Sequence, residues 1–274
     1  MKPSKPVEGE IVLDNQCLQV IIKTPSGCCS IVDKVTGVLW AMDPALGCGA
    51  VAVKQDDGER VYQLGVKGDA GVLFEQNFYM VRSTETDDFH DVSLSGAASD
   101  GSGLKITIRF LFSSTFPIIN CFCYADGEGV ERVIRIEFPI GPTAVSRGAD
   151  RIFAPQDLKS IRDQDASEDV LFEVSPDQEH RMVGAPFYAI VRNDGVHAPS
   201  GMLYFLQHPL SRVDIRDTNG GRIATPSSAH LEATGKTEIQ PYLVRMQIEP
   251  IGDLKALAWL GREQMLAEEQ QFHL

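Results

Sequence analysis

The most constraining feature of this chain is an alternation of apolar and polar side chains in several short segments. In residues 104–110 nearly every second side chain is apolar, and farther along Ile136 and Phe138 fall on the side opposite Arg135 and Glu137. Successive side chains of a β-strand point to opposite faces, so this pattern predicts strands with one buried and one solvated face. In the first segment we expect four residues to point inward: Leu104, Ile106, Ile108 and Phe110.

The sequence between these strands resembles a hairpin. Residues 118–124 are apolar, with β-branched and aromatic side chains, which predicts a strand covered on both faces. Asp126-Gly127 supplies turn chemistry, so we expect this strand to fold back onto residues 130–139.

Short segments of the same kind occupy most of the remaining chain and are separated by turn residues such as Pro25-Ser26-Gly27, Lys34-Val35-Thr36-Gly37 and Asp56-Asp57-Gly58. The chain is therefore predicted to be all-β, a large antiparallel β-sandwich. Further strands are expected at residues 17–22, 29–33, 38–40, 50–54, 60–66, 72–82, 91–95, 170–174, 187–192, 201–207, 212–216, 221–225, 230–233 and 237–248.

We divide the chain into a flexible lead at residues 1–9, one β domain at residues 10–250 and a C-terminal α-helix or linker at residues 251–274. Asp253 is a suitable N-cap for this helix. Its apolar positions form two stripes: Leu254, Leu257, Gly261 and Met265 on one face, and Trp259 and Leu266 on another. A surface helix needs only one such stripe, so the helix is expected to pack in a groove, to form a dimer contact, or to lead into a further domain.

Residues 141–168 are rich in charge and predicted to form a long loop, a type of segment that is usually functional or partly disordered. We select four of its residues as candidates for ligand or domain docking, with a surface set of ion pairs as the alternative. They are Arg147, Asp150, Arg151 and Asp157. Trp40 and Trp259 are added because indole rings stack on sugars, although an aromatic residue of a β-sandwich is more often in the core.

The formal net charge of -13 argues against nucleic acid and anionic membranes as partners, because both attract basic surfaces. A neutral sugar is compatible with this charge. No apolar run approaches the length of a membrane-spanning helix, and no signal peptide is visible, which mildly favours the cytoplasm unless a leader was removed. The six cysteines form no C-x-x-C pair, so buried reduced thiols are favoured over a zinc site.

No compact catalytic or metal motif is present, and no cofactor is expected. Asp163, Asp165 and Asp169 have the spacing that begins a calcium loop, but Glu168 stands where the loop needs glycine and Val174 where it needs glutamate. A solvated acidic loop is the better interpretation. If the chain is an enzyme, His208 and His180, each with an acidic partner, are the catalytic candidates.

Three stretches carry a family resemblance. Residues 31–40, with Asp33-Lys34, Thr36-Gly37 and Trp40, resemble the opening hairpin of the N-terminal β domains of multidomain glycoside hydrolases and their uncharacterised relatives. Residues 134–142 are similar to a later strand of those domains, and residues 196–204 to a later hairpin. The resemblance extends over residues 10–250.

This resemblance implies a galactose-mutarotase-like antiparallel β-supersandwich that precedes a catalytic barrel and carries no catalytic residues itself. The chain is then a non-catalytic module that binds saccharide weakly or docks a catalytic domain through residues 147–157 and the helix bearing Trp259. Aldose 1-epimerases share the fold, but their Asn-His motif is absent, and Pro209 after His208 departs from it. An epimerase-like or lyase-like enzyme and a structural module that oligomerises through the C-terminal helix remain the alternatives.

Overall fold

The computed structural model describes residues 9–66, 75–83, 88–141, 143–144, 150–155, 172–174, 180–183, 187–192, 196–206, 211–218, 221–228 and 241–249, together with helical residues 256, 259–263 and 266–267. These residues form three antiparallel sheets and one α-helix, in agreement with the predicted all-β class. Within them, no helix is long and apolar enough to cross a membrane.

The largest sheet has nine strands. Its order is β14 (Phe172–Glu173), β13 (Asp150–Ala154), β16 (Phe187–Arg192), β17 (Ser200–Leu206), β20 (Tyr242–Glu249), β10 (Ile118–Gly127), β9 (Leu104–Ser113), β8 (Asp88–Ala97) and β7 (Glu75–Ser83). The four residues of β9 that were expected to point inward are fully buried, because the other layer of the sandwich covers that face.

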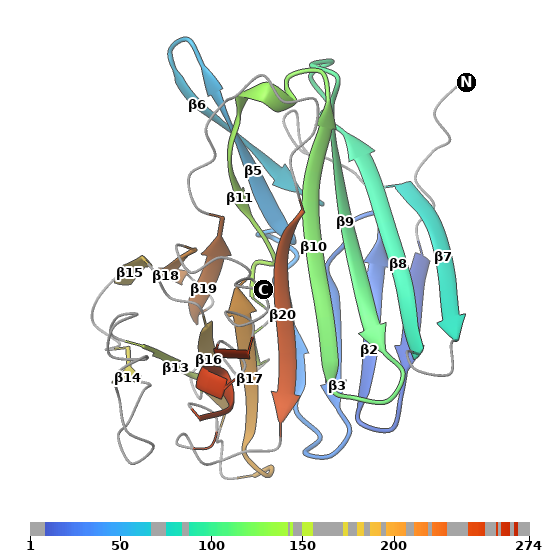
Figure 1. Ribbon diagram of the computed structural model, residues 1–274, viewed down its shortest axis with the longest axis vertical. Helices are drawn as coiled ribbons and strands as arrows, with labels where there is room; N and C mark the ends of the chain where they lie inside the picture. Colours follow the sequence, from blue (N-terminus) through green and yellow to red (C-terminus); the bar gives the residue numbers. More distant parts are fainter. Residues whose placement is uncertain are drawn as a thin grey trace.

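Two smaller sheets provide the opposite layer. The five-stranded sheet runs β1 (Gly9–Asp14), β2 (Leu18–Thr24), β3 (Cys29–Asp33), β4 (Leu39–Ala41) and β12 (Thr143–Ala144). The six-stranded sheet runs β15 (His180–Val183), β18 (Arg212–Thr218), β19 (Gly221–Ser227), β11 (Val133–Glu137), β5 (Gly49–Gln55) and β6 (Gly58–Leu64). Figure 1 shows β7 to β10 in front of β2 and β3.

A single apolar core joins all three sheets. Phe110 of β9 and Phe138, which follows β11, are both fully buried, and their ring centroids lie 6.0 Å apart. Five of the six cysteines are buried, and all six are free thiols, so they serve as small apolar side chains, as expected.

The predicted hairpin between residues 118–124 and 130–139 is wrong. β10 pairs with β9 and β20, whereas β11 pairs with β5 and β19 in the six-stranded sheet. The connection turns at Gly129, whose φ is 82°, and passes through the short 3-10 helix η1 (Val130–Arg132), in which Val130 is buried. Both strands are amphipathic, so placing them in opposite layers lets each bury its apolar face in the shared core. The outer face of β10 is accordingly half-buried rather than covered.

Where the structure describes the predicted loop at residues 141–168, it contains the strands β12 and β13. β13 was missed because Asp150 and Arg151 begin it, and their charge hid the short apolar run that follows. That run, Ile152 to Ala154, is buried, and β13 lies beside the edge strand β14 of the nine-stranded sheet.

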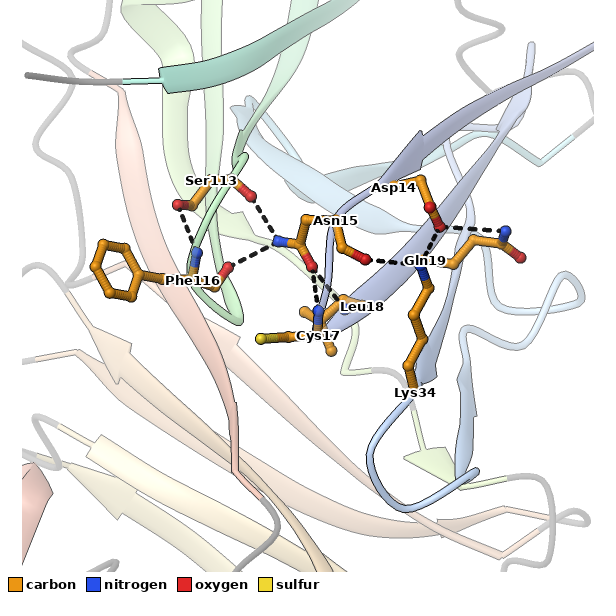
Figure 2. Close-up of polar contacts among 8 residues, drawn as sticks. All are labelled: Asp14, Asn15, Cys17, Leu18, Gln19, Lys34, Ser113 and Phe116. Atoms are coloured by element: carbon orange, nitrogen blue, oxygen red, sulfur yellow. Dashed lines mark hydrogen bonds and ion pairs between the residues drawn. The ribbon is translucent and has the colours of Figure 1, made fainter. Parts of the chain in front are cut away.

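Asn15 fastens the five-stranded sheet to the nine-stranded sheet (Figure 2). Its amide Nδ2 donates to the carbonyl oxygens of Ser113, at 2.7 Å, and Phe116, at 3.1 Å, in the β9–β10 turn. Its Oδ1 accepts from the backbone N–H groups of Cys17 and Leu18 at 2.8 and 2.7 Å. Asn15 is buried, and this arrangement uses both donors and both acceptor positions of the amide.

A second polar anchor lies in the hairpin that carries the family resemblance. The buried Asp33 accepts through Oδ2 from the hydroxyls of Thr36, at 2.5 Å, and Ser200, at 2.9 Å, and through Oδ1 from the backbone N–H of Val35. Gly37 closes the turn with φ 81°. The motif therefore holds the β3–β4 turn against the start of β17.

The C-terminal helix contacts the chain's own nine-stranded sheet. Gly261 is buried there, and a Cβ built on it would lie 2.9 Å from the Phe187 ring. Phe187 and Phe205 are paired across β16 and β17 in the row that continues to Arg245 and Asn120 on the outer face of the sheet. The helix thus covers an apolar part of that outer face at Phe187.

We predict that Asn15→Asp lowers the free energy of unfolding by about 2–4 kcal/mol, because a carboxylate cannot donate to the two carbonyls. Chemical denaturation with fluorescence detection measures this. Asn120→Asp is the matched control, since Asn120 is half-buried and its Oδ1 accepts from Arg245 at 3.0 Å, a bond that a carboxylate keeps. Equal losses in the two variants would contradict the role of Asn15.

We predict that Gly261→Ala destabilises the protein, although the same change in the interior of an exposed helix raises the free energy of unfolding by about 1 kcal/mol. The new methyl group would meet the buried Phe187 ring, which has little room to move. Hydrogen exchange of the helix amides should quicken in this variant. Glu263→Ala, at an exposed position of the same helix, should leave it unchanged; a slower exchange in Gly261→Ala would refute the packing argument.

Candidate functional site

Most of the residues selected from the sequence lie outside the described residues. These are Arg147, Asp157, Asp163, Asp165, Asp169 and His208. The backbone of His180 begins β15, where it pairs with Ile215, but its side chain is not described.

Asp150 and Arg151 lie on β13 and are engaged in ion pairs. Arg151 makes a two-pronged contact with Glu173 of β14, with 2.8 Å between its Nε and a carboxylate oxygen. Its guanidinium also lies 5.0 Å from the centre of the Phe153 ring. Asp150 lies 3.9 Å from Arg192. The Arg151–Glu173 pair is exposed, and such a pair contributes little to stability, whereas the Asp150 and Arg192 side chains are largely buried.

The two tryptophans occupy different environments. Trp40 is fully buried in the core, so its ring has no face open to a sugar, and its selection as a ligand-stacking residue is wrong. Trp259 on the C-terminal helix is 39% exposed, and the Arg262 guanidinium lies 5.2 Å from its ring centre. It remains available at the surface.

A groove of about 300 Å³ lies on the outer face of the six-stranded sheet, and we call it the Arg135 groove. It forms because β5 places the small side chains of Ala50 and Ala52 between the larger side chains of β11 and β6. Its lining combines apolar and polar groups: Leu46, Gly49, Ala50, Val61, Gln63, Arg135, Glu137, Ile140, Ile223 and Thr225.

Arg135 is held in this groove by two carboxylates. Its Nη1 and Nη2 donate to Glu59 at 3.1 and 2.5 Å, and its Nε donates to Oε1 of Glu137 at 2.8 Å. The hydrogen bonds to Glu59, and then the one to Glu137, raise the pKa of Arg135, so the guanidinium stays charged. With one cation facing two anions, the groove does not attract an anionic ligand.

A second pocket, of about 370 Å³, lies where the β5–β6 turn meets the β8–β9 and β10–β11 connections. Its Asp100 carboxylate is already bonded by three neighbours. The hydroxyl of Tyr62 donates to Asp100 at 2.8 Å, and Arg60 contacts the same carboxylate at 2.8 Å. The other oxygen of Asp100 accepts from the backbone N–H of Ser102. The Arg135 groove is therefore the better candidate site.

Sequence reasoning placed Arg135 and Glu137 on the solvated face but did not select them. No local signal shows that Gln63 and Thr225, far away along the chain, line the same hollow, since that depends on which strands flank β11. Over the described part of the chain, no group of three or more His, Cys, Asp or Glu residues is arranged to hold a metal ion.

No family model matches this sequence, and no curated protein matches it. Solved structures do. An α-N-acetylgalactosaminidase of Bifidobacterium bifidum matches with a TM-score of 0.57 and 12% identity over 89% of this chain and 36% of the enzyme. The GH36 α-galactosidase AgaA of Geobacillus stearothermophilus matches with a TM-score of 0.55 and 8% identity over 88% of this chain and 40% of the enzyme.

An α-galactosidase of Lactobacillus brevis matches in the same way, with a TM-score of 0.56 and 9% identity over 88% of this chain and 39% of the enzyme. At these identities the likeness is one of fold. The chain spans about two-fifths of each hydrolase. It therefore has the fold of one domain of multidomain glycoside hydrolases, which confirms the resemblance seen in the sequence and the predicted β-sandwich class.

Proposed function

We propose that this chain is a non-catalytic module of a glycoside hydrolase system, which docks an adjoining catalytic domain or binds saccharide weakly. One observation carries the proposal: the solved hydrolases match nearly the whole of this chain, but the chain accounts for only about 36–40% of their length. The larger part of each enzyme thus lies outside the fold that the two proteins share.

For the docking role we favour the outer surface near the C-terminal helix. Trp259 presents a partly exposed aromatic ring beside Arg262, and aromatic residues and arginine are enriched at protein interfaces. The helix rests on the nine-stranded sheet through Gly261, which gives this surface a rigid support. Residues 147–157 belong to the same proposal, with the exposed Arg151 on β13.

Two alternatives stay in view. An epimerase-like or lyase-like enzyme would need His208 or His180 with a carboxylate in one pocket. Of the other histidines, His90 stacks against Phe112 with 5.9 Å between ring centres, and His197 is exposed. A structural module would instead self-associate through the C-terminal helix, and its mass in solution would be a multiple of the 30.0 kDa chain.

We predict no turnover by the purified chain. The assays are hydrolysis of aryl α-galactoside and aryl α-N-acetylgalactosaminide, the substrate classes that the matched enzymes' names indicate, and polarimetric mutarotation of α-D-galactopyranose. A commercial α-galactosidase and a mutarotase serve as positive controls. Mutarotation or hydrolysis that disappears in His208→Ala or His180→Ala would replace the module by the enzyme alternative.

A further inference from the structure

The Arg135 groove contains a buried hydroxyl that has no partner. Thr225 of β19 is 2% exposed, and its Oγ1 makes no hydrogen bond to any residue that the structure describes. Burying a hydroxyl without a bond costs about 1–3 kcal/mol, and valine has nearly the same shape at no such cost. Polar atoms of Trp40, Tyr188, Tyr242 and Ser211 are also buried without a hydrogen bond, but none of these residues lines the Arg135 groove, whereas Thr225 does.

Two further polar groups in the groove have unused hydrogen-bonding capacity. Glu137 contacts Arg135 through Oε1, and its Oε2 makes no hydrogen bond within the described part of the chain. The exposed Gln63 amide likewise makes none there. Strand pairing places these groups together, because Glu137 lies opposite Ala50, and Ala50 lies opposite Gln63. Glu137, Gln63 and Thr225 thus line the hollow together with Ala50.

The remaining walls are apolar. Val61, which is 41% exposed, lies on β6, Ile223 on β19, and Ile140 just beyond β11. A ligand matched to this lining has hydroxyl groups that both donate and accept, carries C–H surface, and bears no charge. The two carboxylates around Arg135 disfavour a phosphate or carboxylate group, and the spare hydroxyl, carboxylate oxygen and amide are poorly matched by an apolar ligand.

We propose that the Arg135 groove binds a neutral saccharide ring, with Thr225, Glu137 and Gln63 as the hydrogen-bonding groups. This inference rests on the proposed function and deepens it, since it names the place where a weakly binding module would hold its sugar. Arg135 is a positioning residue, which fixes the Glu137 carboxylate through its Nε and is itself fixed by Glu59.

The test is a titration of the full chain, labelled with ¹⁵N, with methyl glycosides of galactose, glucose, mannose, xylose and N-acetylgalactosamine, monitored by NMR. We expect at least one glycoside to shift the amide signals of β5, β6, β11 and β19. Inorganic phosphate in the same range should leave them in place. If no glycoside shifts any signal, or if the shifts map to other strands, the proposal is overturned.

Thr225→Val provides the decisive variant. It removes an unbonded buried hydroxyl, so the melting temperature should stay the same or rise, while the affinity for the glycoside should fall about 2- to 10-fold. Gln63→Ala, at an exposed position, should weaken binding without a change in melting temperature. Wild-type affinity in both variants would overturn the assignment of these residues.

Thr107→Val is the matched control. Thr107 is also buried, but it lies on β9 and its hydroxyl bonds the Ser95 hydroxyl at 2.7 Å. This variant should lose stability and keep its affinity, the opposite of Thr225→Val. The result is independent of the turnover assays. If the groove binds sugar and the chain also shows turnover, only the non-catalytic proposal is overturned. If the groove binds no sugar and the chain shows no turnover, only the proposal of a saccharide site is overturned.

Discussion

The shared apolar core between the nine-stranded sheet and the two smaller sheets is the constraint on which the rest of the structure depends. Every strand that borders this core must point its apolar side chains into it. A shift of the strand pairing by one residue would turn all of these side chains to the outer face. This explains why β11 leaves β10 and crosses to the opposite layer. In a hairpin, both apolar faces would lie on one sheet and the opposite layer would lose Ile136 and Val133, which are fully buried.

Apolar packing is non-directional, so directional interactions such as hydrogen bonds are needed to fix the position of the layers relative to each other. Asn15 and Asp33 provide such bonds, because each is buried and each bonds a residue from a distant part of the chain. A buried amide or carboxylate tolerates little displacement of its partners. Leaving a buried polar group without a hydrogen bond destabilises the fold by more than forming that bond stabilises it. The two anchors therefore hold the sheet ends in place.

Much of the fold follows from local pattern, and the candidate site does not. The alternation of residues 104–110 and the turns with glycine at positive φ, such as Gly37, are set by neighbours in sequence, and they were predicted. The partner of β11 is set by competition among many amphipathic strands, and it was predicted wrongly. β13 was missed because its first two residues are charged, a choice that its ion pairs with β14 and β16 make favourable. Trp40 was misjudged because residue type alone does not distinguish a tryptophan packed in the core from one that stacks on a ligand.

The Arg135 groove arises from the pairing of β11 with β5 and β19, which could not be predicted from the sequence. A sheet face is flat where neighbouring side chains are similar in size, and here β5 places alanines between an arginine strand and a strand bearing Gln63. The hollow is thus a consequence of small residues on one strand, whereas its chemistry comes from the two strands beside it and from β19. Stability alone favours valine at position 225, because the threonine hydroxyl is buried without a bond. Departures of this kind from the stable choice are concentrated at functional sites. The coincidence of an unbonded hydroxyl with the hollow, rather than the size of the hollow, is therefore what draws attention to this face of the protein.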